Sequence, residues 1–300
     1  MFKRVGLFIL VNICVMVVGS FMIGLIMKVF GLGPSYGPSG INYGSLMTIC
    51  LVWGMAGSFV SLFISKWMAK SMYGVQVMEA HGSYGSLVQK VHMLAKRAGI
   101  SKMPEVGVYD SPEANAFATG SSKNNSLVAV STGLMNQMTD DELEGVLAHE
   151  VAHVANGDMV TMALVQGVVN AFVMFFARIV TFAIDSFLRG DDEEGGGLGF
   201  FASMFVNMAL QVVFGILAAP IVMGFSRWRE YRADAGSAQL AGKEKMIAAL
   251  EALKRNYNQL GDAETSVQAM QISSKESFTE LFSSHPPLEK RIQALKKLSR

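Results

Sequence analysis

Residues 149–153 read His-Glu-Val-Ala-His, and a long run without charged residues, Met159–Ala177, begins shortly after them. Upstream, Thr139-Asp-Asp-Glu142 has the pattern of a capping box, which starts a helix. Apolar residues then recur at helical spacing: Leu143, Val146, Leu147 and Val151. The stretch therefore predicts a polar-faced helix outside the membrane that leads within a few residues into a membrane span.

The composition of the whole chain also indicates a membrane protein. Of its 300 residues, 51% are hydrophobic and only 16% are charged, and its mean hydropathy is +0.35. Ordinary soluble domains carry about 25% charged residues. The formal net charge of +1 argues against a nucleic-acid partner. Two cysteines exclude a disulfide scaffold and a site built mainly on thiolates.

Four apolar runs are long enough to cross a bilayer, which takes about 20 residues of helix. They are Val5–Met27, Ile41–Ser65, Met159–Ala177 and Leu198–Ser226. The first run has a cleaved signal peptide as its alternative, but it is long for that role and lacks an A-x-A site. The last two runs are less uniformly apolar than the first two, so a shallow or re-entrant hairpin is the alternative for them.

Basic residues collect at the outer flanks of the first two runs and after the fourth. Lys3 and Arg4 precede the first run, Lys66 and Lys70 follow the second, and the loop at 31–40 between them carries no charge. The fourth run is likewise followed by arginines, at 227, 229 and 232. The positive-inside rule therefore predicts that both termini and the polar segments lie in the cytoplasm.

The segments outside the runs predict a mainly helical domain with a small β-sheet, an α+β arrangement. Helical spacing predicts helices at Ser86–Ala98, Ala235–Tyr257 and Pro287–Leu298. Short β-rich runs bounded by turn residues predict strands at Glu105–Tyr109 and Ser126–Val130. Together these segments are long enough to form one compact domain with its own core.

His149 and His153 are four residues apart, so on a helix their side chains share one face. Two imidazoles placed in this way suit adjacent corners of a tetrahedral zinc site. Glu150 lies beside them and is suited to take a proton from an attacking water. The alternative is an amphipathic helix whose two histidines share a face by chance.

A third ligand is expected from Glu230, because a catalytic zinc takes three protein ligands and keeps one position open. Glu230 and Asp234 are also four residues apart, so one carboxylate can ligate the metal while the other holds a histidine N–H. A hairpin of the third and fourth runs returns the chain to the side of the histidines. Taken alone, this pair of carboxylates is also typical of a solvated helix face with arginine partners.

In these features the chain resembles the HtpX family of bacterial membrane-integral zinc endopeptidases, which is related to the CAAX prenyl proteases. The resemblance covers the two pairs of spans, His149–His153, Glu230–Asp234 and the tail motif Ser284-His-Pro-Pro287. It implies one Zn²⁺ per chain held by His149, His153 and Glu230, with Glu150 as the base and Asp234 behind the ligands. It also implies that His285 and Arg291 bind substrate and stabilise the oxyanion.

The segment from Glu113 to Gly120 resembles the part of these enzymes beside the cleft. A bound peptide could extend the sheet there, with Asn115 supplying an amide to its backbone. The alternatives are a strand and turn that pack Phe117, a loop role for His285, and a surface helix position for Arg291.

The resemblance implies four segments. Residues 1–70 form an N-terminal transmembrane hairpin and residues 159–226 form a second one. Residues 71–158 and 227–300 form a zincin-like cytoplasmic peptidase domain. The expected function is zinc-dependent cleavage of misfolded or damaged membrane proteins or unfolded polypeptides at the cytoplasmic face of the inner membrane, as quality control under stress. The alternatives are a processing protease for lipidated C-termini and a non-catalytic adaptor with a vestigial metal site.

Overall fold

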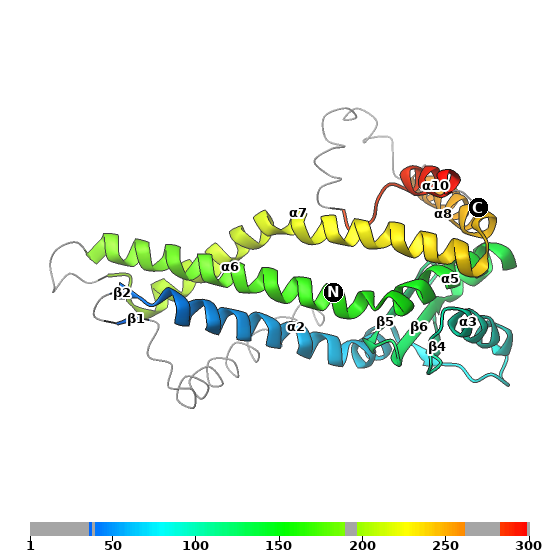
Figure 1. The fold of residues 1–300 in the computed structure, drawn as a ribbon, viewed down its shortest axis with the longest axis horizontal. Helices are drawn as coiled ribbons and strands as arrows, with labels where there is room; N and C mark the ends of the chain where they lie inside the picture. The colour runs from blue at the N-terminus through cyan, green and yellow to red at the C-terminus, as the bar shows by residue number, and fades with distance from the viewer. Residues whose placement is uncertain (1–35, 38–39, 190–196, 262–282, 299–300) are drawn as a thin grey trace. The chain divides into compact units, whose positions relative to one another are not determined.

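The computed structural model describes residues 36–37, 40–189, 197–261 and 283–298 (Figure 1). The chain divides into two compact units, residues 1–60 with 163–219 and residues 61–162 with 220–300. The predicted span Val5–Met27, and with it the signal-peptide alternative, lies outside the described residues.

Three long helices correspond to the second, third and fourth apolar runs. They are α2 (Tyr43–Tyr73), α6 (Asp158–Arg189) and α7 (Gly199–Ala241), and each is long and apolar enough to cross a membrane. Before α2, the two-residue strands β1 (Tyr36–Gly37) and β2 (Gly40–Ile41) pair with each other. Each of the three helices continues beyond the apolar run that predicts it.

In the first unit, α2 and α6 approach closely through small residues. A Cβ atom on Gly54 would lie 2.6 Å from the carbonyl oxygen of Gly167 and 2.8 Å from the amide nitrogen of Ala171. Cys50 and Leu46, one and two helical turns before Gly54, are buried against Ala171. Small residues that let two backbones approach are typical of helix contacts in membranes.

Several polar side chains in the first unit have partners within it. The amide of Asn207 donates to the Thr181 hydroxyl, and the amide of Gln211 donates to Asn207. Asp185 near the end of α6 accepts a hydrogen bond from the backbone N–H of Leu198 just before α7. These contacts tie α6 to α7 without leaving the polar groups unpaired in an apolar environment.

The second unit contains a mixed four-stranded sheet in the order β3-β4-β6-β5. The strands are β3 (Gln76–Val77), β4 (Glu105–Tyr109), β5 (Ala116–Ser122) and β6 (Asn125–Ser131). β4 and β6 are parallel, whereas β3 and β5 pair antiparallel with their neighbours. The two predicted strands are confirmed as β4 and β6, and β5 forms an edge of the sheet.

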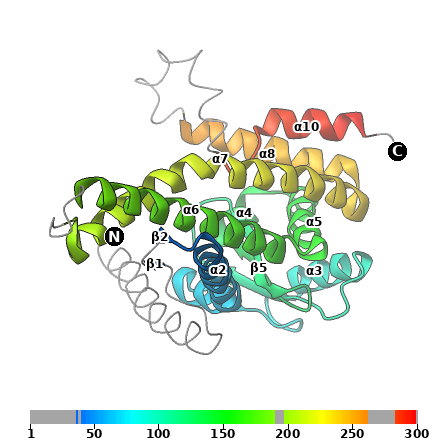
Figure 2. The ribbon, with the colours of Figure 1, turned by 60° about the vertical axis from the view of Figure 1, so that its left-hand side comes forward.

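Within the described residues, five helices complete the second unit, together with the ends of α2, α6 and α7. They are α3 (Gly85–Arg97), α4 (Thr132–Gln137), α5 (Asp140–Asn156), α8 (Lys243–Gly261) and α10 (Leu288–Lys297). The main core lies between one face of the sheet and the helices α3, α5 and α8. Figure 2 shows α8 and α10 lying side by side, and buried leucines and isoleucine join them.

The predicted helix Ala235–Tyr257 is wrong as a single element. α7 ends at Ala241 and α8 begins at Lys243. Gly242 between them has φ of +102°, which only glycine adopts at low cost. The chain therefore turns at this glycine, and α8 packs on α5 instead of extending α7.

Candidate active site

The helix with the two histidines has well-defined ends. Thr139 accepts a hydrogen bond from the backbone of Glu142, and the Glu142 carboxylate accepts one from the backbone N–H of Thr139. The helix stops at Gly157, which has φ of +71°. Both termini of α5 are therefore fixed, the first of them where the capping box predicts a helix start, and His149 and His153 lie in its last two turns.

Small residues let α5 pack tightly against α7 and α8. A Cβ atom on Gly145 would lie 2.6 Å from the carbonyl oxygen of Lys245, and one on Gly236 would lie 2.9 Å from the Cβ of Ala152. The buried Ser237 hydroxyl donates to the Gly145 carbonyl at 2.9 Å. These contacts set the distance from α5 to the part of α7 that carries Glu230.

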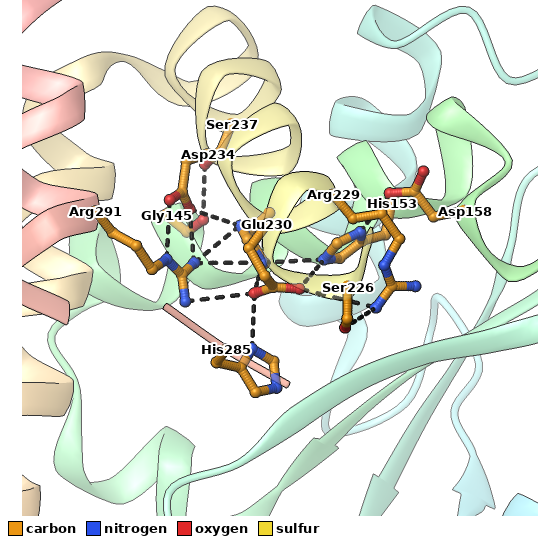
Figure 3. Close-up of polar contacts among 11 residues, drawn as sticks. Gly145, His153, Asp158, Ser226, Arg229, Glu230, Asp234, Ser237, His285 and Arg291 are labelled. Carbon is orange, nitrogen blue, oxygen red and sulfur yellow. Dashed lines mark hydrogen bonds and ion pairs between the residues drawn. The ribbon is translucent and has the colours of Figure 1, made fainter. Parts of the chain in front are cut away.

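His153 and Glu230 face each other at the centre of the site (Figure 3), and His149 converges with them. The Nε2 atoms of the two histidines are 3.1 Å apart. Glu230 Oε1 lies 3.2 Å from His153 Nε2, and Glu230 Oε2 lies 3.5 Å from His149 Nε2. One ligand atom from each of the three side chains lies within 4.8 Å of the others.

Each histidine is held from behind by a buried carboxylate. His149 Nδ1 lies 3.0 Å from Asp234 Oδ1, and His153 Nδ1 lies 2.6 Å from Asp158 Oδ2. Asp158 is 1% exposed and follows Gly157 as the first residue of α6. Both contacts leave Nε2 facing the centre of the site. The sequence predicts Asp234 but not Asp158, whose only signal is its position directly after the glycine that ends α5.

The acidic surroundings raise the pKa values of both histidines. Burial lowers the pKa of His149, but hydrogen bonds to Asp234 and Glu230 outweigh it, so the value lies above its usual range. For His153, burial is again opposed, here by Asp158 and Glu230, and the pKa rises to about 9. The site therefore favours positive charge at its centre.

Arg291 is buried and is not a surface helix residue. It is 5% exposed, and its Nε and Nη2 atoms donate to the two carboxylate oxygens of Asp234 at 2.9 and 2.6 Å. Its Nη1 lies 3.4 Å from Glu230 Oε2. His285 Nδ1 lies 2.8 Å from the same oxygen, while 63% of the His285 side chain is exposed. The structure therefore brings both residues to the Glu230 carboxylate.

The two remaining predicted site residues are Glu150 and Asn115, and their surroundings differ. Glu150 is half-buried, and its charge acts on His153 and Arg291. Asn115 is exposed just before β5, and its backbone carbonyl accepts from Ser131 N–H at 2.9 Å. Among the described residues, no hydrogen bond joins the Asn115 side chain to the histidines or Glu230. Its expected substrate role stays a prediction.

Among the described residues, the edge strand β5 has a neighbouring strand on one side only, β6. The Asn115 carbonyl points toward β6, and in an antiparallel ladder alternate residues point the same way. Ala116 and Ala118 therefore turn their N–H and C=O groups away from β6, to the open edge. β5 packs on α5 through these same alanines. An extended peptide added here would run beside the helix that carries the histidines.

The three side chains fit a metal ion. Glu230 Oε1 is buried and has no hydrogen-bond partner among the described residues, although it faces His153 Nε2. Two imidazole nitrogens and one carboxylate oxygen form a ligand set typical of catalytic zinc. A cation there would satisfy the unpaired oxygen.

Comparison with known proteins identifies the family. The sequence profile of peptidase family M48 matches residues 83–299, which include every residue of the site. The chain belongs to peptidase family M48. It is 51% identical to Protease HtpX of Tolumonas auensis over 298 residues, with 99% of each chain covered. It is 52% identical to Protease HtpX of Shewanella pealeana over 296 residues, covering 98% of this chain and 99% of the relative.

The M48 peptidase also shares its fold with a solved structure, Ste24p of S. mikatae. The TM-score is 0.62 at 21% sequence identity, and the match covers 92% of this chain and 61% of Ste24p. These comparisons confirm the resemblance to the HtpX family, the mainly helical fold with a small sheet, and the prediction of a metallopeptidase. With its three apolar helices, the M48 peptidase is a multi-pass membrane protein.

Asp158→Asn is expected to weaken metal binding about 10- to 100-fold, because losing a charged partner behind a ligand histidine reduces its basicity and its orientation. The measurement is metal retention during titration with a chelator. Glu251→Gln on the exposed surface of α8 is the matched control, since it removes one carboxylate away from the site. Equal retention by wild type and the Asp158 variant would contradict a role for Asp158 in holding His153.

Proposed function

We propose that this M48 peptidase is a zinc-dependent endopeptidase of the bacterial cytoplasmic membrane that cleaves misfolded or damaged membrane proteins. The observation that supports it is the convergence of His149 Nε2, His153 Nε2 and a Glu230 oxygen within 4.8 Å of one another. Residues 71–158 and 227–300 form the peptidase domain, and residues 1–70 and 159–226 form two hairpins that keep it at the membrane.

In this proposal His149, His153 and Glu230 hold the zinc, and Asp234 and Asp158 orient the two imidazoles. When bound, zinc acts as a Lewis acid that polarises a peptide carbonyl and water. Glu150 removes a proton from the attacking water and later delivers it to the leaving amine.

His285 and Arg291 approach Glu230 from one side and can donate hydrogen bonds to the developing oxyanion. Arg291 contributes Nη1, because its Nε and Nη2 are committed to Asp234. His285 is more exposed than Arg291 and is therefore better placed to contact a substrate.

The open edge of β5 supports unfolded polypeptides as substrates. Backbone groups of Ala116 and Ala118 can pair with any extended chain, whatever its side chains. Asn115, exposed just before this edge, is placed to add an amide contact. The basic residues that flank the spans support a cytoplasmic position for the site and both termini.

The test uses the full-length protein in lipid nanodiscs, stripped with a chelator and reloaded with one metal at a time. We expect zinc to restore cleavage of a destabilised membrane protein, while its folded wild-type form is cut much more slowly. Cysteine accessibility in spheroplasts should place residue 285 on the cytoplasmic side. Chelator-resistant cleavage, or equal cleavage of the folded and destabilised substrates, would contradict the proposal.

A further inference from the structure

Arg229 is a second arginine at the site, and the mechanism above does not use it. It precedes Glu230 on α7, and its guanidinium lies on the opposite side of Glu230 from Arg291 (Figure 3). Only 19% of its side chain is exposed. A cationic side chain this enclosed normally has close acidic partners.

The contacts of Arg229 are few and long. Its Nη2 lies 3.5 Å from the Ser226 hydroxyl and 3.9 Å from Glu230 Oε1, and the second distance is too long for a hydrogen bond. Its Nε is buried and has no hydrogen-bond partner among the described residues. Arg291, by contrast, donates twice to Asp234 at 2.6 and 2.9 Å.

Three buried carboxylates at the site already have partners. Asp234 accepts from Arg291, Asp158 faces His153, and Glu230 faces both histidines and His285. Within the described part of the chain, Arg229 therefore keeps unused donors on a planar fork, the shape that binds a carboxylate through two parallel hydrogen bonds. Leaving a buried donor unpaired is unfavourable, so a group that enters the site with the substrate is the natural partner.

We propose that Arg229 binds a carboxylate of the polypeptide substrate close to the scissile bond. The inference rests on the proposed function and deepens it, because it adds a side-chain preference to a site that otherwise recognises backbone. The carboxylate can belong to an Asp or Glu side chain or to the C-terminus of the substrate, and both sources offer the same pair of oxygens.

The experiment uses zinc-loaded full-length protein and quenched-fluorescence peptides that differ only by Asp or Asn at one position near the cleavage site. All have amidated C-termini, except for one series with a free terminal carboxylate near the scissile bond. We expect kcat/KM to favour Asp at one position, or the free terminus, about tenfold or more. The series that shows the preference identifies the source of the carboxylate.

Arg229→Gln should bring the kcat/KM ratio of the Asp peptide to the Asn peptide close to one, through a higher KM for the Asp peptide. Arg229→Glu should favour Lys at the same position. Arg232→Gln is the charge-matched control, because Arg232 is exposed on the same helix and lies over the Trp228 ring. That control should retain the wild-type preference for the carboxylate.

Three results would overturn the role of Arg229: no preference in wild type, an unchanged preference in Arg229→Gln, or loss of zinc from that variant. A binding measurement distinguishes failure of this inference from failure of the proposed function. Labelled Asp and Asn peptides are titrated by fluorescence anisotropy into zinc-loaded Glu150→Gln protein, with and without Arg229→Gln. A preference for Asp that depends on Arg229 would support the inference even if no peptide were cleaved.

Discussion

Replacing Glu150 with Gln is expected to reduce proteolysis by about 100- to 10,000-fold, the range that general acid–base catalysis contributes. The amide keeps the size of the side chain but cannot take a proton from water. Metal content should stay at the wild-type level, because Glu150 is not among the three side chains whose ligand atoms converge. The measurement is kcat on a quenched peptide together with metal analysis of the same sample.

A wild-type rate in this variant would contradict the assignment of Glu150 as the base. Loss of metal would show instead that Glu150 acts through the metal site. Glu251→Gln again serves as the control, since it makes the same chemical change on the exposed surface of α8. Both variants should show the same thermal unfolding transition as wild type in detergent.

Replacing Glu230 with Gln is expected to bring the metal content well below one ion per chain and abolish proteolysis. An amide is a poor metal ligand, and two histidines alone leave a catalytic site one ligand short. The buried carboxylate also faces both histidines, His285 and Arg291, so its loss leaves cationic groups without their anion. The measurement is metal content after dialysis against buffer that contains zinc.

The stability of the Glu230 variant is a necessary second measurement, because the residue is 1% exposed. A folded variant with full metal content would exclude Glu230 as a ligand. His149→Gln and His153→Gln should show the same loss of metal, since each removes one of the three converging ligand atoms. Agreement among the three variants would separate loss of a ligand from loss of the fold.

Much of the site can be predicted from the sequence because the helical repeat determines which residues share a face. The four-residue spacing places His149 beside His153, and the same spacing aligns Glu230 with Asp234. The capping box at Thr139 fixes where the first of these helices begins. Local rules such as these need no knowledge of the tertiary structure.

Contacts between segments that are distant in sequence are harder to predict from the sequence. The resemblance brings Arg291 to the site, but its ion pair with Asp234 depends on how α10 packs on α8. Asp158 belongs to a different helix from His153, and a repeat within one helix cannot identify it. The break at Gly242 is difficult to predict, because residues with high helix propensity flank it on both sides.

Gly145 and Gly236 carry no reactive group, yet they govern how near Glu230 comes to the imidazoles. Alanine scanning detects most residues through the side-chain atoms that it removes. At these two glycines, the change to alanine instead adds a methyl group that disturbs the helix packing. One extra methyl group at either glycine would act as a wedge between neighbouring helices. A survey of every substitution should therefore mark both glycines as intolerant, beside the residues that perform the chemistry.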